Sequence, residues 1–133
     1  MRQEKCDMSS LEDVNIINMG IEAGTHASRM GVDRTTINNL ISVFYGERDP
    51  VKGVLLTQVY IARQKGRREI HESVSKVLMD HINRIYNAWK GNQDALKKAM
   101  DLYLLVMKWS FESNVPQSRN IDEFVRNAIG GGG

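Results

Sequence analysis

The stretch from residue 55 to residue 68, LLTQVYIARQKGRR, constrains the fold of this chain most strongly. Apolar side chains recur in its first half at helical spacing, which predicts a helix with one buried stripe. We expect that stripe to consist of Leu55, Leu56, Val59, Tyr60 and Ala62. The branched and aromatic residues of this stretch also fit a strand, but nothing else in the chain supplies a sheet partner. The stretch therefore predicts an all-helical protein.

The second half of the same stretch is basic. Its four cations are Arg63, Lys65, Arg67 and Arg68, and the preceding loop adds Arg48 and Lys52. Cations are favoured near the C-terminus of a helix because the unpaired carbonyls there carry partial negative charge. A solvated helix end and a site for a polyanion both explain this cluster at the level of the sequence.

Length and composition indicate one soluble domain. The chain has 133 residues, of which 41% are hydrophobic and 26% charged, values typical of a globular protein with a sizeable core. No apolar run approaches the roughly 20 residues of a membrane span, and the first residues do not resemble a signal peptide. A single cysteine, Cys6, fits a reducing compartment, so we expect a cytoplasmic protein with no membrane association.

Helical periodicity and capping signals predict a compact helical bundle of five to seven helices. We expect helices over 11–23, 25–32, 34–45, the central stretch after Gly53, 67 or 69 to 89, 94–113 and 121–129. Ser9 with Glu12 and Asn120 with Glu123 form capping-box patterns, and Asp33 and Asp94 are the expected caps of two further helices. Gly20 and Gly24 are expected to weaken the end of the first helix.

The two longest expected helices have the clearest apolar stripes. The stripe of the helix ending near residue 89 consists of Ile70, Val74, Val77, Leu78, Ile82, Ile85 and Trp89. The stripe of the helix ending near residue 113 consists of Leu96, Met100, Tyr103, Leu104, Met107 and Phe111. These stripes belong to a single domain over 11–129, with a disordered leader at 1–10 and a flexible glycine tail at 130–133.

Catalytic chemistry lacks its usual parts in this sequence, so we expect no enzyme, no cofactor and no metal. His71 and Glu72 begin a zincin-like pair, but Ser75 stands where the second histidine is required. No glycine is followed by the Lys-Ser or Lys-Thr of a phosphate-binding loop. We therefore interpret His71 and His81 as surface histidines or as helix residues with satisfied hydrogen bonds.

Charge is distributed unevenly along the chain. The net charge is +2, but residues 1–51 hold five basic and eight acidic residues, a balance of −3, whereas residues 52–133 hold thirteen and eight, a balance of +5. A basic surface on the second part of the chain predicts a polyanionic partner. This balance does not distinguish nucleic acid from an acidic protein, and a helical adaptor with merely solvated cations is a third interpretation.

Residues 25–42 favour DNA binding as an alternative. Ala27, Gly31, Ile37 and Leu40 reproduce the spacing of a helix-turn-helix, in which a small residue, a turn glycine and two core residues recur. Arg34, Thr35 and Asn38 would then face the bases. Asp33 and the negative balance of the first 51 residues oppose phosphate binding at this site.

The order of features from Thr35 to Ser113 resembles the small all-helical subunit of type III CRISPR RNA-guided effector complexes. The shared features are a Thr-Thr helix start at Thr35–Thr36, an aromatic pair at Phe44–Tyr45, the pattern Leu55, Leu56, Tyr60, Ala62, Arg63, Gly66, Arg67, and an aromatic-rich helix from Tyr103 to Phe111. The chain differs at Asn38 and Asn39, where that family often has a basic residue, and at Trp109, near a usual Tyr-His.

The resemblance implies a non-catalytic subunit whose copies stack as a filament and line the channel for CRISPR RNA paired with target RNA. Its partners would be these two RNAs, other subunits of the effector complex and further copies of itself. A subunit that accepts any RNA sequence contacts phosphates and sugars rather than base edges. The expected RNA-binding residues are Arg63, Lys65, Arg67 and Arg68, followed by Arg48 and Lys52.

Overall fold

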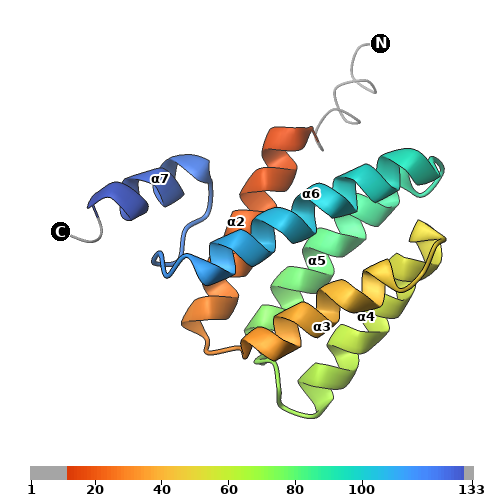
Figure 1. The fold of residues 1–133 in the computed structure, drawn as a ribbon, viewed down its shortest axis with the longest axis horizontal. Helices are drawn as coiled ribbons and strands as arrows, with labels where there is room; N and C mark the ends of the chain where they lie inside the picture. The colour runs from red at the N-terminus through yellow and green to blue at the C-terminus, as the bar shows by residue number, and fades with distance from the viewer. Residues whose placement is uncertain (1–11, 131–133) are drawn as a thin grey trace.

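The computed structural model describes residues 12–130, which fold into an all-helical bundle (Figure 1). Its helices are α2 (Asp13–Arg29), α3 (Arg34–Tyr45), α4 (Pro50–Gly66), α5 (Glu72–Trp89), α6 (Gln93–Glu112) and α7 (Ile121–Gly130). Within these residues there is no strand, which confirms the predicted fold class. Ser9 and the expected leader lie outside the described residues, as does most of the glycine tail.

Helix α2 is longer than predicted and includes the segment that we expected to form a second helix. It runs without a break to Arg29, and its two inner glycines are buried against α6, the helix with which it packs most extensively. A glycine inside a helix lowers the stability of that helix relative to alanine. The loss can be offset where the absence of a side chain lets another helix pack closely. Here Gly20 and Gly24 allow the backbones of α2 and α6 to approach closely, so the predicted helix end at residue 23 was wrong.

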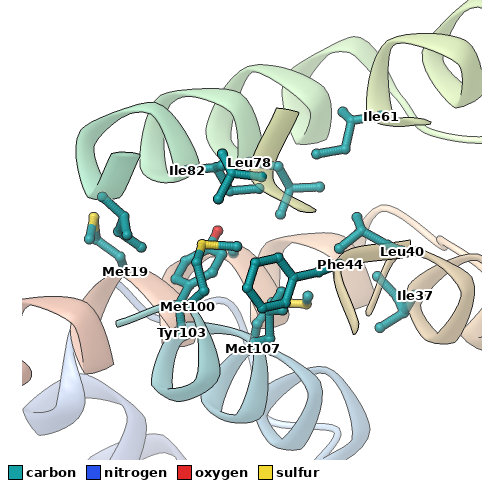
Figure 2. Packing of buried hydrophobic residues seen from close by; sticks show 14 of the residues in the cluster. Met19, Ile37, Leu40, Phe44, Ile61, Leu78, Ile82, Met100, Tyr103 and Met107 are labelled. Carbon is teal, nitrogen blue, oxygen red and sulfur yellow. The ribbon is translucent and has the colours of Figure 1, made fainter. Parts of the chain in front are cut away.

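Three α-helices, α5, α6 and α3, supply much of the core around Phe44 (Figure 2). The predicted stripe of α5 is confirmed for five of its seven members, because Val74, Leu78, Ile82 and Ile85 are buried, as is Ile70 just before the helix. The other two, Val77 and Trp89, are partly buried and pack against the core. The predicted stripe of α6 is confirmed for five of its six members, and Phe111 packs at the edge of the core. Spacing by threes and fours on a single face was sufficient to identify these two buried faces.

The buried face of α4 differs from the prediction. The helix begins at Pro50, with the Asp49 side chain accepting a hydrogen bond from the Val51 N–H, so the expected loop at 46–53 is shorter. The residues that it buries are Pro50, Gly53, Val54, Thr57, Ile61 and Gln64. Four of the five residues of the predicted stripe are exposed: Leu55, Leu56, Val59 and Ala62. Tyr60 is half-buried, so the prediction of a buried face here was wrong.

The predicted caps of α3, α6 and α7 are confirmed only in part. Helix α6 is capped by Asn92, whose side chain accepts from the Ala95 N–H at 3.1 Å, and Asp94 lies inside the first turn. Asp33 occupies the N-cap position of α3 but makes no capping hydrogen bond with its side chain. The Asn120 side chain accepts from the Glu123 N–H as predicted, whereas the Glu123 carboxylate accepts from the Arg119 N–H instead of closing the box.

Helix α7 lies beside the bundle and buries none of its residues (Figure 1). Hydrogen bonds to α2 hold the first residue of α7 and the segment that precedes it. The Ser118 N–H donates to the buried Thr25 hydroxyl at 2.9 Å, and the Ile121 N–H donates to the Asn18 side chain at 2.9 Å. The position of α7 thus depends on polar side chains of α2.

Candidate nucleic-acid interface

The six predicted RNA-binding cations all lie on or beside α4 and are exposed. Arg48 and Lys52 stand at its beginning, and Arg63, Lys65, Arg67 and Arg68 at its end. A helix of 17 residues is about 25 Å long at 1.5 Å per residue, so the two groups lie far apart along one edge of the molecule. None of the six forms an ion pair with a carboxylate among residues 12–130.

Helix geometry divides the four C-terminal cations between two directions. Successive residues of an α-helix are rotated by about 100°, so Arg63 and Lys65 point to nearly opposite sides of α4. Lys52 and Arg63 are eleven residues apart, close to three whole turns, and share one side. Lys65 and Arg68 instead line a hollow of about 520 Å³ near the turn between α2 and α3. The structure therefore exposes all six cations without placing them on a single surface.

Arg68 occupies an unusual backbone conformation. Its φ is +64°, in the left-handed region that glycine normally occupies after a helix. The Arg68 N–H donates to the Lys65 carbonyl at 3.0 Å and the Glu69 N–H donates to the Gln64 carbonyl at 2.8 Å, the bonding pattern of a Schellman turn. Gly66, two residues earlier, is the last residue of α4. The turn thus holds an exposed guanidinium at a position where glycine would be less strained.

The hollow beside Lys65 and Arg68 has mixed charge. Its other ionisable residues are Glu69 and His71, from the segment between α4 and α5, and Glu72, the first residue of α5. The turn residues Met30, Gly31 and Val32 form its far side. Glu72 forms a long ion pair with Lys76, with 3.9 Å between Oε2 and Nζ. Two carboxylates near the two cations make the hollow a poor phosphate cavity.

The helix-turn-helix residues occupy the positions that the alternative requires. Ala27, Ile37 and Leu40 are buried, and Gly31 has a φ of +76° in a turn closed by the Val32 N–H on the Ala27 carbonyl. Arg34 and Thr35 are exposed and Asn38 is half-buried. Asp33 is exposed beside Arg34, so a carboxylate does lie among the residues that would face DNA.

Polar side chains that sequence reasoning missed connect α2 to α5 and to the segment before α7. The Ser73 hydroxyl lies 2.9 Å from both His26 Nε2 and His71 Nδ1, and His71 Nδ1 accepts from the Ser73 N–H, which caps α5. His26 and Arg29 both contact the Gln117 side-chain oxygen. In the sequence, the only indication of this network was His71 directly before a predicted helix. That position does not reveal which side chains of other helices lie close to it. This network provides hydrogen-bond partners for polar groups near the C-terminus of α2 and the N-terminus of α5, and it fixes the position of these two helix ends.

His81 is the other histidine with a structural role. It is 3% exposed, and its two ring nitrogens lie 3.0 Å from the Tyr103 hydroxyl and 2.9 Å from the Glu22 carboxylate. Burial lowers the pKa of His81 below its ordinary value of 6.5, although Glu22 acts in the opposite direction. The neutral ring donates to Glu22 and accepts from Tyr103, so both bonds are satisfied without a charge. The interpretation of this histidine as a satisfied helix residue is confirmed.

No group of three or more potential metal ligands exists in the part of the chain that the structure describes. Within the same residues, none of the helices has the length and apolar character that crossing a lipid bilayer requires. Comparison with family models, curated proteins and solved structures finds no match for the chain. The function must therefore be argued from the residues and their geometry.

Proposed function

We propose that this chain is a non-catalytic RNA-binding subunit of a type III CRISPR effector complex. It contacts the sugar-phosphate backbone of CRISPR RNA and target RNA in the cytoplasm, without reading their sequence, and assembles with other subunits and with copies of itself. The observation that carries the proposal is the set of six exposed cations along α4, none of which is neutralised by a carboxylate among the described residues. The feature order described from the sequence supports the same function.

Arg68 is the most informative of the six cations. A side chain other than glycine in the left-handed region costs about 1 kcal/mol. The turn retains an arginine although a glycine would relieve that cost, which favours a use for the guanidinium outside the fold. Lys65 and Arg67 lie within three residues of it, and we assign these three side chains to the end of the proposed RNA path.

The test removes these three charges in the variant Lys65→Gln/Arg67→Gln/Arg68→Gly. We expect its affinity for a labelled single-stranded RNA of mixed sequence to fall at least about tenfold at low salt, because phosphate contacts dominate such binding. The dependence of log K on log salt should lose about 0.7 per contact, or roughly two units for three contacts. Fluorescence anisotropy over a series of salt concentrations measures both quantities. Because glycine relieves the strain at position 68, the variant is expected to remain folded.

A matched control removes three cations outside α4 that are already paired with carboxylates: Arg84→Gln/Lys97→Gln/Arg119→Gln. These residues contact Asp80, Asp101 and Glu123 respectively. The net charge changes equally in both triple variants, so a general electrostatic effect would weaken RNA binding by the same factor in each. Equal losses, or no loss in the first variant, would remove the proposed site.

The second candidate function is a helix-turn-helix DNA-binding protein that uses residues 25–42. The observation that favours it is the left-handed Gly31 between buried Ala27 and Ile37, with Arg34 and Thr35 exposed at the start of the following helix. Selection of bound duplexes from a random library is expected to enrich a motif if this candidate is correct. Arg34→Gln and Thr35→Ala should each erase part of that motif. Selection without any enrichment would contradict it.

A further inference from the structure

Helix α4 packs against the bundle in an unexpected orientation. It buries the polar side chains Thr57 and Gln64, and it exposes Leu55, Leu56 and Val59, which are 45%, 46% and 65% accessible. Thr57 is satisfied internally, because its hydroxyl donates to the Gly53 carbonyl at 2.7 Å. Single exposed aliphatic residues are common on protein surfaces, but three on one side of one helix form a patch that indicates an interaction site.

The charges beside this patch all have the same sign. Helix α4 contains no aspartate or glutamate between Pro50 and Gly66. Lys52 and Arg63 lie on the same side as Leu55, Leu56 and Val59, and the structure gives neither cation a carboxylate partner among the described residues. Eleven residues at 1.5 Å per residue place their backbones about 16 Å apart, with the aliphatic side chains between them. We call these five residues the outer face of α4.

We propose that the outer face of α4 docks an acidic amphipathic helix of a partner protein. That helix would present aliphatic side chains to Leu55, Leu56 and Val59 and would carry carboxylates about 16 Å apart, opposite Lys52 and Arg63. Helices that dock in this way use apolar anchors at intervals of three and four residues. The phosphates of an RNA backbone gain nothing from leucine and valine side chains, so this surface is distinct in chemistry from the cations at 65, 67 and 68.

A second copy of this chain fits the outer face less well. Outside α4, the helix with the most exposed large apolar residues is α7, where Ile121, Val125 and Ile129 are accessible. The acidic residues of α7, Asp122 and Glu123, are both in its first turn, and Glu123 is already paired with Arg119. Such a helix offers carboxylates at one end only. Arg126 would then lie near one of the cations of α4, which is unfavourable.

The experiment uses the full chain and two labelled, lactam-bridged helical peptides. Both carry Leu, Leu and Val between two charged residues at the spacing of Lys52 and Arg63; in one peptide the charged residues are glutamates, and in the other they are lysines. Fluorescence anisotropy at low salt is expected to show binding of the glutamate peptide only. Leu55→Ser/Val59→Ser should weaken this binding at least about tenfold, the size of effect that loss of a central apolar anchor produces. Lys52→Glu/Arg63→Glu should reverse the preference, so that the lysine peptide binds instead.

A matched control is Leu105→Ser/Trp109→Ser, which removes two exposed apolar side chains of α6 and should leave peptide binding unchanged. Circular dichroism melts of all variants are expected to match the wild type, because the substituted side chains are exposed. Failure of the wild-type chain to bind the glutamate peptide would overturn the proposal. A wild-type dimer in sedimentation velocity that dissociates in Leu55→Ser/Val59→Ser would assign the face to a second copy instead. Loss of RNA affinity in that variant would assign the face to RNA. Because Leu55→Ser/Val59→Ser leaves all six proposed RNA-binding cations in place, its outcome is separate from the test of the proposed function.

Discussion

Replacing Gly24 with alanine is expected to destabilise the protein by about 3 kcal/mol or more, because the new methyl group has no space. A Cβ atom at this position would lie 2.3 Å from the Met107 carbonyl oxygen and 2.9 Å from the Phe111 backbone nitrogen. Both are backbone atoms of α6, so the clash cannot be relieved by moving a flexible side chain. Helices α2 and α6 would have to separate, which would open the largest helix–helix contact of the bundle.

Thermal and urea denaturation followed by circular dichroism measure this loss. For a domain of this size, about 3 kcal/mol corresponds to a decrease of roughly 10 °C in the melting temperature. Gly66→Ala is the matched control, because a Cβ atom there would meet no other heavy atom within 4 Å. Alanine is favoured over glycine inside a helix, so this control is expected to be neutral or to stabilise by up to about 1 kcal/mol. Similar melting temperatures for both variants would show that α2 and α6 do not pack as closely as described.

Replacing His81 with phenylalanine is expected to cost about 2–3 kcal/mol, since it leaves a fully buried tyrosine hydroxyl without its partner. Tyr103 is 0% exposed, and the only hydrogen bond of its hydroxyl among the described residues is the one to His81 Nδ1. The double variant His81→Phe/Tyr103→Phe removes both polar groups together. Its free energy of unfolding should therefore decrease by less than the sum of the two single variants. Strictly additive losses in urea denaturation would contradict a direct bond between these side chains.

The same histidine predicts a pH dependence of stability. Because burial lowers the pKa of His81 in the folded state, the unfolded chain binds a proton at pH values where the folded chain does not. Its stabilising contribution is fully present above about pH 6.5 and is lost as the pH falls below that value. The charged groups near the ring are Glu22 from α2 and Asp80 and Arg84 from α5, with Tyr103 from α6. The free energy of unfolding should fall more steeply between pH 7 and pH 5 for the wild type than for His81→Phe. Parallel profiles would contradict this assignment.

Local sequence was sufficient for the elements whose apolar residues lie on one face. The five residues Ile70, Val74, Leu78, Ile82 and Ile85 are buried as predicted, because a strict spacing by threes and fours leaves only one side of a helix to bury. The exposure of the six cations on α4 was also predictable, because charged side chains rarely lose water without a partner. Which of these cations share one side of the molecule was not predictable, because that depends on the rotation of α4 about its axis and on where its final turn ends.

The amino-acid sequence by itself determined that this chain forms helices, roughly where most of them lie, and that its cations are exposed. Tertiary structure alone decided which side of α4 is buried, because its apolar residues cover several directions and the neighbouring helices selected Val54 and Ile61 over Leu55 and Val59. It also decided that Gly20 and Gly24 belong to a continuous helix, because atoms of α6 fill the space that side chains at these two positions would occupy. Periodicity describes one helix at a time, whereas burial depends on the shape of what packs against it.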